Sequence, residues 1–62
     1  MSENYDEKMQ RLCDQIRRNL TEDEMINILE DAGFAVDESG QELIEALAEA
    51  VEQGDVCESC IE

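Results

Sequence analysis

The stretch from residue 38 to residue 52 constrains the fold most, because it predicts an amphipathic helix whose polar face carries one sign of charge. Its glutamates are spaced by four, three, four and three residues, at Glu38, Glu42, Glu45, Glu49 and Glu52. At ~100° per residue these carboxylates fall within roughly an 80° wedge of a helix, opposite the apolar positions. Like charges at this spacing disfavour a helix slightly. The row is therefore either tolerated for solubility or positioned to meet a positively charged partner.

Two other segments show helical periodicity. Between residues 4 and 19 apolar side chains recur every three or four positions, and Asn4 is the expected N-cap. In the second segment Thr21 and Glu24 have the spacing of a capping box, and Gly33 is the expected C′ residue. The turn between these two helices is therefore predicted to be very short.

The third helix is expected to begin after Ser39, with Glu42 completing a second capping box, and to end near Gln53 with Gly54 as its C′ residue. Residues 1–62 are thus predicted to form a single acidic domain of the mainly α class, a small three-helix domain. A two-stranded ribbon of residues 34–36 against residues 56–57 is one alternative for the connecting segments. In the other, residues 55–62 remain irregular.

The net charge of −14 is placed unevenly along the chain. Residues 1–20 contain four acids and four bases, whereas residues 21–62 contain fourteen acids and no base. Such a field excludes nucleic acid and anionic membrane as direct ligands and favours a basic partner. It also predicts self-repulsion that added salt relieves.

Three cysteines, an odd number, argue against a secreted disulfide scaffold. The sequence has no signal peptide pattern and no long apolar run, so we expect a cytoplasmic protein. Cys57 and Cys60 form a C-x-x-C pair, which serves elsewhere as a redox centre or as half of a zinc site. A closed zinc site here requires a carboxylate or a second chain, because the sequence contains no histidine. Cys13 lies on the apolar face of the first helix and is expected in the core.

Catalysis has little support in this sequence. Without histidine and without any base after Arg18, no nucleophile–base pair can be assembled by spacing. No register of the three glycines completes an EF-hand calcium loop. We therefore expect a non-enzyme with no cofactor and no metal ligand set.

Binding remains as the predicted activity. Proteins that grip duplex DNA use rows of Arg and Lys, and a rigid helix bearing aligned carboxylates fits such a row. In size, charge and absence of catalytic motifs, the chain resembles the small phage-encoded inhibitors that imitate DNA, such as anti-CRISPR and anti-restriction proteins. The resemblance covers composition along the chain and no motif. It implies inhibition of a DNA-binding host-defence complex, a CRISPR effector or restriction system, in the host bacterial cytoplasm.

The expected partner is a basic, DNA-binding protein or complex, engaged by a monomer or weak dimer. The acidic residues expected to contact it are Glu38, Glu42, Glu45, Glu49, Glu52, Glu22, Asp23, Glu30, Asp31 and Asp37. Three alternatives stay open. The acids are a solvated face only, the chain is a small thiol redox or metal-linked protein using Cys57 and Cys60, or it is a generic acidic module for a basic partner unrelated to DNA.

Overall fold

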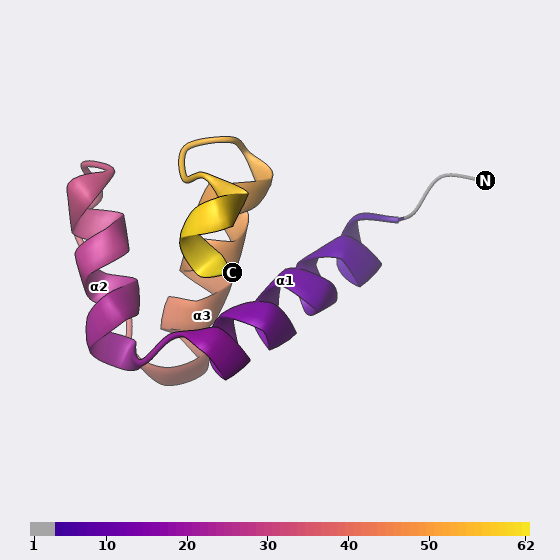
Figure 1. Ribbon diagram of the computed structural model, residues 1–62, viewed down its shortest axis with the longest axis horizontal. Helices are drawn as coiled ribbons and strands as arrows, with labels where there is room; N and C mark the ends of the chain where they lie inside the picture. Colours follow the sequence, from indigo (N-terminus) through magenta and orange to yellow (C-terminus); the bar gives the residue numbers. More distant parts are fainter. Residues whose placement is uncertain (1–3) are drawn as a thin grey trace.

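The computed structural model describes residues 4–62 and consists of helices joined by short connections (Figure 1). In chain order the elements are α1 (Tyr5–Asn19), α2 (Glu22–Asp31), α3 (Gly40–Glu52) and the short 3-10 helix η1 (Glu58–Ile61). The predicted mainly α class and the three predicted α-helices are confirmed. No helix within the described part of the chain is both long enough and apolar enough to cross a membrane.

The helix starts follow from local side-chain chemistry. The Asn4 carboxamide oxygen accepts a hydrogen bond from the Glu7 backbone N–H at 2.8 Å, which confirms the predicted N-cap of α1. At α2 the capping box is complete. The Glu24 N–H donates to the Thr21 hydroxyl at 3.3 Å, and the Thr21 N–H donates to the Glu24 carboxylate at 2.8 Å. This box starts α2 only three residues after α1 ends, as the sequence predicts.

Glycines end α2 and α3 in the same way. Gly33 and Gly54 have φ values of 94° and 89°, the left-handed region that other residues avoid. The turn after α2 is closed by the Phe34 N–H donating to the Leu29 carbonyl at 3.0 Å. The turn after α3 is closed by the equivalent bond to Ala50 at 2.9 Å. Both are Schellman motifs, and both predicted C′ glycines are confirmed.

The predicted capping box at α3 is wrong. Ser39 is the N-cap residue, but its side chain makes no capping hydrogen bond. A different donor of the first turn is satisfied from outside the helix, because the Gly40 N–H donates to the Glu22 carboxylate at 3.2 Å. An acid in the first turn of α2 therefore contributes to the start of α3 through tertiary packing, without replacing the bond from the Glu42 N–H that a capping box requires.

The predicted ribbon is also wrong, because residues 4–62 contain no strand. The backbone N–H groups of Phe34 and Val56 are used to close α2 and α3, through the carbonyls of Leu29 and Ala50. Val56 is buried in the core, and Cys57 already serves as the N-cap of η1. Because these two N–H groups are occupied, neither can donate the hydrogen bonds that a strand pair between the two segments requires.

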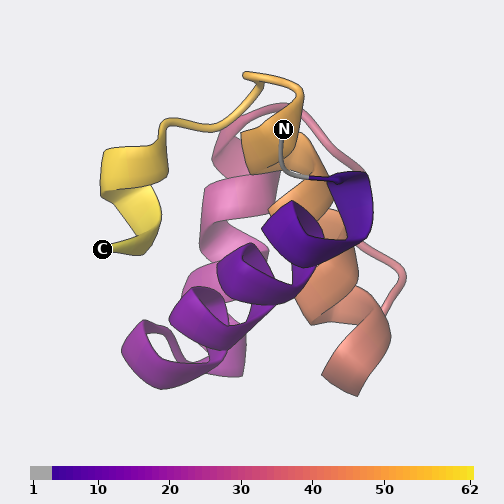
Figure 2. The same cartoon turned by 90° about the vertical axis from the view of Figure 1, so that its right-hand side faces the viewer.

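The core lies where α1 and α2 both pack against α3. The views in Figures 1 and 2 show α3 behind α1 and beside α2. Contacts join the C-terminal part of α1 to the N-terminal part of α3 through Arg17 and Gln41, so the two helices run antiparallel. The buried residues are Leu12, Cys13, Ile16, Met25, Leu29, Leu43, Ile44, Leu47, Ala48, Ala50, Val56 and Ile61.

The end of the chain belongs to this core. Ile61 is fully buried, and its carbonyl accepts a hydrogen bond from the Asn19 side chain at 3.0 Å. That bond ties η1 to the last residue of α1, and the two elements are in contact. The irregular alternative for residues 55–62 therefore misses a short helix that the burial of Ile61 holds in place.

Candidate functional site: an acidic groove between α1 and α3

An open groove of about 1180 Å³ lies between α1 and α3. Because the two helices run antiparallel, the first turns of α1 face the last turns of α3. The groove is lined by Asn4, Tyr5, Asp6, Glu7, Met9, Gln10, Cys13, Asp14, Arg17, Glu38, Gln41, Glu42, Glu45, Ala46 and Glu49. These residues include seven carboxylates and one guanidinium, which gives a net charge of −6.

The predicted glutamate row forms one side of this groove. Glu38, Glu42, Glu45 and Glu49 all line it, and all four are exposed. Glu52, the fifth member of the row, is half-buried and is not among the lining residues. The three-four spacing places Glu42, Glu45 and Glu49 along one face of α3, which is called the α3 rim below, whereas Glu38 precedes α3 and lines the groove from the connecting segment.

The opposite rim comes from α1 and was missed by sequence reasoning. Asp6, Glu7 and Asp14 line the groove across from the α3 rim. In the sequence these acids stand among the four bases of residues 1–20, and none of them is among the contact residues expected from the sequence. The seven-residue separation of Glu7 and Asp14 places both on one face of a helix, and this signal was present. Only the packing of α1 against α3 places this face opposite α3.

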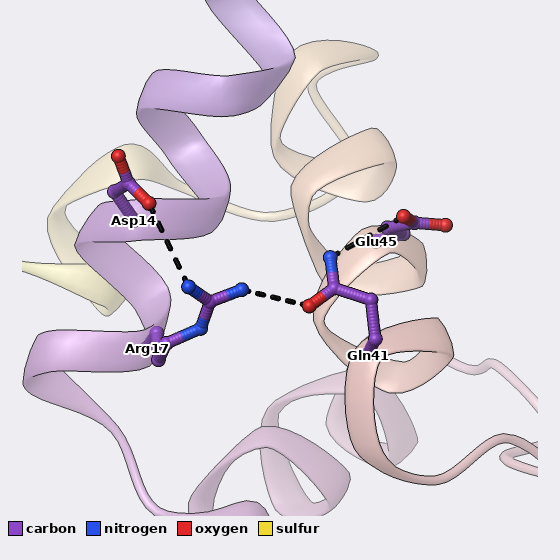
Figure 3. Close-up of polar contacts among 4 residues, drawn as sticks. All are labelled: Asp14, Arg17, Gln41 and Glu45. Carbon is purple, nitrogen blue, oxygen red and sulfur yellow. Dashed lines mark hydrogen bonds and ion pairs between the residues drawn. The ribbon is translucent and has the colours of Figure 1, made fainter.

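One end of the groove is closed by a polar chain that links the two helices (Figure 3). Arg17 donates from Nη2 to Oε1 of Gln41 at 2.7 Å, and Gln41 donates from Nε2 to Oε2 of Glu45 at 3.3 Å. Nη1 of Arg17 also lies 3.9 Å from the Asp14 carboxylate. These groups are exposed, so their polar contacts orient the side chains more than they stabilise the fold.

The floor of the groove is apolar. Met9 and Ala46 are half-buried, Cys13 is buried, and Tyr5 is 53% exposed at the open end. Partial desolvation raises the pKa of Tyr5, and the carboxylates of Glu49, Glu52 and Asp6 raise it further. The negative field of the groove therefore acts on a side chain whose ring is available for contact.

The thiol at the base of the groove experiences the same field. Burial raises the pKa of Cys13, the charges of Glu45 and Asp14 add to that increase, and Arg17 opposes it. Cys13 is 8% exposed, which confirms its predicted place in the core. A buried thiol with a raised pKa is a poor nucleophile, so Cys13 serves packing.

The remaining predicted contact residues lie outside the groove. The Glu22 carboxylate is occupied with the Gly40 N–H at the start of α3. Asp23, Glu30 and Asp37 are exposed and do not line the groove. Asp31 lines a smaller pocket of about 260 Å³ between the end of α2 and the segment after α3. The structure therefore places four of the predicted contact residues in the groove, Glu52 at the end of α3, and the other five on or near α2.

The C-x-x-C pair lies at that smaller pocket. Cys57 and Cys60 are exposed and free, and the Cys60 N–H donates to the Cys57 carbonyl at 3.0 Å, which closes the turn of η1. Within residues 4–62 no three His, Cys, Asp or Glu side chains are grouped so that they could hold a metal ion. The pair can therefore offer two ligands of the four that a structural zinc needs.

A comparison with known families assigns the three-helix part of the chain to a protein family. The profile of the PADR1 N-terminal helical domain matches residues 1–50. The chain belongs to this family. The match extends into the last turns of α3, so the PADR1 helical domain contains the whole α1–α3 groove, whereas Cys57 and Cys60 follow the matched region. No curated protein and no solved structure gives a significant match to the chain.

This assignment corrects the resemblance drawn from composition. Size and charge suggested the phage-encoded anti-CRISPR and anti-restriction inhibitors, but the family match is to the PADR1 helical domain. Composition misled because net charge and length describe a surface in bulk, whereas a family profile depends on which residue stands at each position. The predicted resemblance to the phage-encoded inhibitors is therefore wrong.

Proposed function

We propose that this PADR1 helical domain is a non-catalytic interaction module that binds the basic, DNA-contacting surface of a nucleic-acid-binding protein. The observation that supports the proposal is the α1–α3 groove, which is lined by seven carboxylates and one guanidinium. Such a concentration of one sign attracts a surface of the opposite sign and makes association fast and dependent on ionic strength.

The arrangement of the α3 rim supports a DNA-contacting surface as the target. Successive carboxylates of this rim are ~5 Å apart along a rigid helix, at 1.5 Å of rise per residue. The surfaces that bind duplex DNA present Arg and Lys in comparably regular rows, because they follow a regularly spaced phosphate backbone. The α3 rim can occupy such a row, and the protein then competes with DNA for it.

The test is a competition with matched charge variants. The triple variant Glu42→Gln, Glu45→Gln, Glu49→Gln removes three charges from the α3 rim, and Asp23→Asn, Glu30→Gln, Asp31→Asn removes three from α2. We expect the rim variant to bind a basic helix-turn-helix DNA-binding domain roughly tenfold more weakly, because exposed ion pairs contribute ~0.2–1 kcal/mol each. The α2 variant should lose much less. Binding is measured by fluorescence anisotropy at ~0.1 M salt, where the Debye length is ~10 Å.

Duplex DNA is added as the competitor in the same experiment. Displacement of the protein by duplex shows that both ligands use the same basic surface. Equal losses in the two triple variants show that only total charge matters, and they overturn the groove as the site. Absence of binding to the basic domain overturns the proposed function itself.

A second candidate function uses the C-x-x-C pair. Both thiols are exposed on one turn of η1 beside Asp31 and Asp55, so they can supply half of a thiolate metal site shared with another polypeptide segment. The double variant Cys57→Ser, Cys60→Ser tests this. We expect the wild-type protein to develop thiolate-to-cobalt absorption on titration with Co²⁺ and the variant to develop none. Identical spectra for the two proteins contradict this candidate, and unchanged binding of the basic domain by the variant separates it from the groove.

A further inference from the structure

We infer that the α1–α3 groove docks an amphipathic basic helix, with apolar residues of the partner on the groove floor and its Arg and Lys residues on both rims. This inference rests on the proposed function, because it specifies the part of the basic partner that enters the groove. It goes beyond charge attraction in assigning the partner a secondary structure, a length and a pattern of side chains.

The spacing of the carboxylates on the α3 rim matches the repeat of an α-helix better than the repeat of an extended strand. The rim carboxylates recur every three or four residues, which is ~4.5–6 Å along the axis. Basic residues on one face of a partner helix recur at the same interval, since the pitch of an α-helix is ~5.4 Å. Same-face residues of an extended strand recur at ~6.6 Å, so an extended partner falls out of register after two or three pairs.

The groove has two acidic rims with an apolar floor between them, which favours an amphipathic partner. Glu7 and Asp14 stand on the α1 rim, opposite the α3 rim, and the floor between them is formed by Met9 and Ala46 with Tyr5 at the open end. A strand or loop rich only in Lys and Arg has nothing to place on that floor. A helix with an apolar stripe flanked by basic residues places each group against its complement.

The length of the α3 rim and the charge of the chain limit the choice of occupant. From Glu42 to Glu49 the rim is ~10 Å long, which corresponds to about two turns of a partner helix. A second copy of this chain is a poor occupant, because its net charge is also −14. Every base of the chain lies between Lys8 and Arg18, within α1 itself, so residues 4–62 offer no separate basic segment to fill the groove.

Replacing Arg17 is expected to strengthen binding of the partner, whereas replacing the carboxylates of the groove is expected to weaken it. The Arg17 guanidinium is the single positive group among the lining residues and is held at the closed end of the groove by Gln41 and Asp14. It therefore repels the cationic rows of an incoming helix where they approach that end. Replacing Arg17 with Met keeps much of the side-chain volume and removes the repulsion, so Arg17→Met should bind the partner helix a few-fold more tightly.

The experiment uses two synthetic peptides of about 14 residues, roughly four helical turns, which is long enough to span the two turns of the α3 rim. Both contain the same Leu, Ala, Lys and Arg residues. One places Leu on a single helical face flanked by the bases, and the other has the same residues scrambled. We expect the amphipathic peptide to bind at least tenfold more tightly by isothermal titration calorimetry, to gain helical circular dichroism on binding, and to bind Tyr5→Ala a few-fold more weakly.

Each outcome decides a separate point. Equal affinity of the two peptides, or binding without a gain of helix, overturns the helix-docking inference while leaving acidic attraction intact. An Arg17→Met variant with weaker binding contradicts the placement of the cationic rows. Failure of the proposed function shows differently, as no binding of either peptide or of the basic DNA-binding domain. Because Met9 packs against the core, Tyr5→Ala, at an exposed position, is the preferred test of the apolar contact.

Discussion

Cys13 connects the core to the groove at the scale of a single residue. It is buried against the hydrophobic cluster, yet it lines the groove and senses the charge of Glu45 and Asp14. The same position therefore feels both low polarity and a negative field. Both disfavour the thiolate, and Arg17 only partly offsets them.

This environment predicts a loss of stability at alkaline pH. The folded-state pKa of Cys13 is raised above its ordinary value of 9.0, so the folded protein holds this proton more tightly than the unfolded chain does. The resulting stability is fully present below pH 9.0 and is lost as the pH rises through the folded pKa. We expect the melting temperature to fall as the pH rises above 9.0, and less steeply for Cys13→Ala.

Tyr5 is the control for this measurement, because its pKa is also raised, from an ordinary value of 10.0. A Tyr5→Phe variant should change the profile only above that pH, and weakly, since the ring is more than half exposed. An identical alkaline slope in wild type and Cys13→Ala would show that the thiol is not the responsible group.

At the scale of the element, the two helix starts after α1 show how similar sequence patterns acquire different structures. Thr21 and Ser39 are both hydroxyl N-caps followed by a glutamate three positions later. The Thr21 box forms, whereas the Ser39 hydroxyl makes no capping bond and Glu22 accepts from Gly40 instead. The pattern is therefore not sufficient for a box, because the same spacing at Ser39 leaves its side chain without a capping hydrogen bond.

A pair of alanine substitutions measures this difference. Thr21→Ala should cost about 1 kcal/mol of the free energy of unfolding, the usual value of a lost N-cap. Ser39→Ala should change it by less than about 0.5 kcal/mol, as expected for a surface change that removes no contact. Urea denaturation followed by circular dichroism provides both values. Equal losses at the two positions would mean that Ser39 caps α3 in solution.

At the scale of the whole molecule, charge opposes compaction. The fourteen acids of residues 21–62 have no base among them, and four of the carboxylates follow one helix face. A domain of this size has a small core and a free energy of unfolding of only a few kcal/mol. Repulsion of this kind is therefore a substantial fraction of the balance, and salt should act directly on it.

We expect the melting temperature to rise by about 4–8 °C between ~10 mM and ~0.5 M NaCl, equivalent to about 1 kcal/mol in a domain of this length. Differential scanning fluorimetry at neutral pH measures the change. The Glu42→Gln, Glu45→Gln, Glu49→Gln variant should start from a higher melting temperature and respond less to salt. A melting temperature that falls with added salt would show that attractive ion pairs outweigh the repulsion.

The sequence by itself determined the parts of this protein that depend on neighbours three or four positions away. Asn4, the Thr21 and Glu24 pair, and the two C′ glycines specify the ends of the helices, because a cap or a Schellman turn is completed within one turn of chain. The four-three spacing of the glutamates likewise predicted one acidic face on α3. Mainly helical class and three helices follow from such local rules.

Only the tertiary structure decided where those faces lie. The antiparallel packing of α1 on α3 brings Glu7 and Asp14 opposite the glutamate row and turns a charged helix face into a groove with an apolar floor. Packing also placed the Glu22 carboxylate where it accepts from the Gly40 N–H at the start of α3, and it buried Ile61 where the sequence pattern predicted a strand or an irregular segment. These features join residues that lie far apart in sequence, and their positions follow from how apolar faces pack together, which no local spacing encodes.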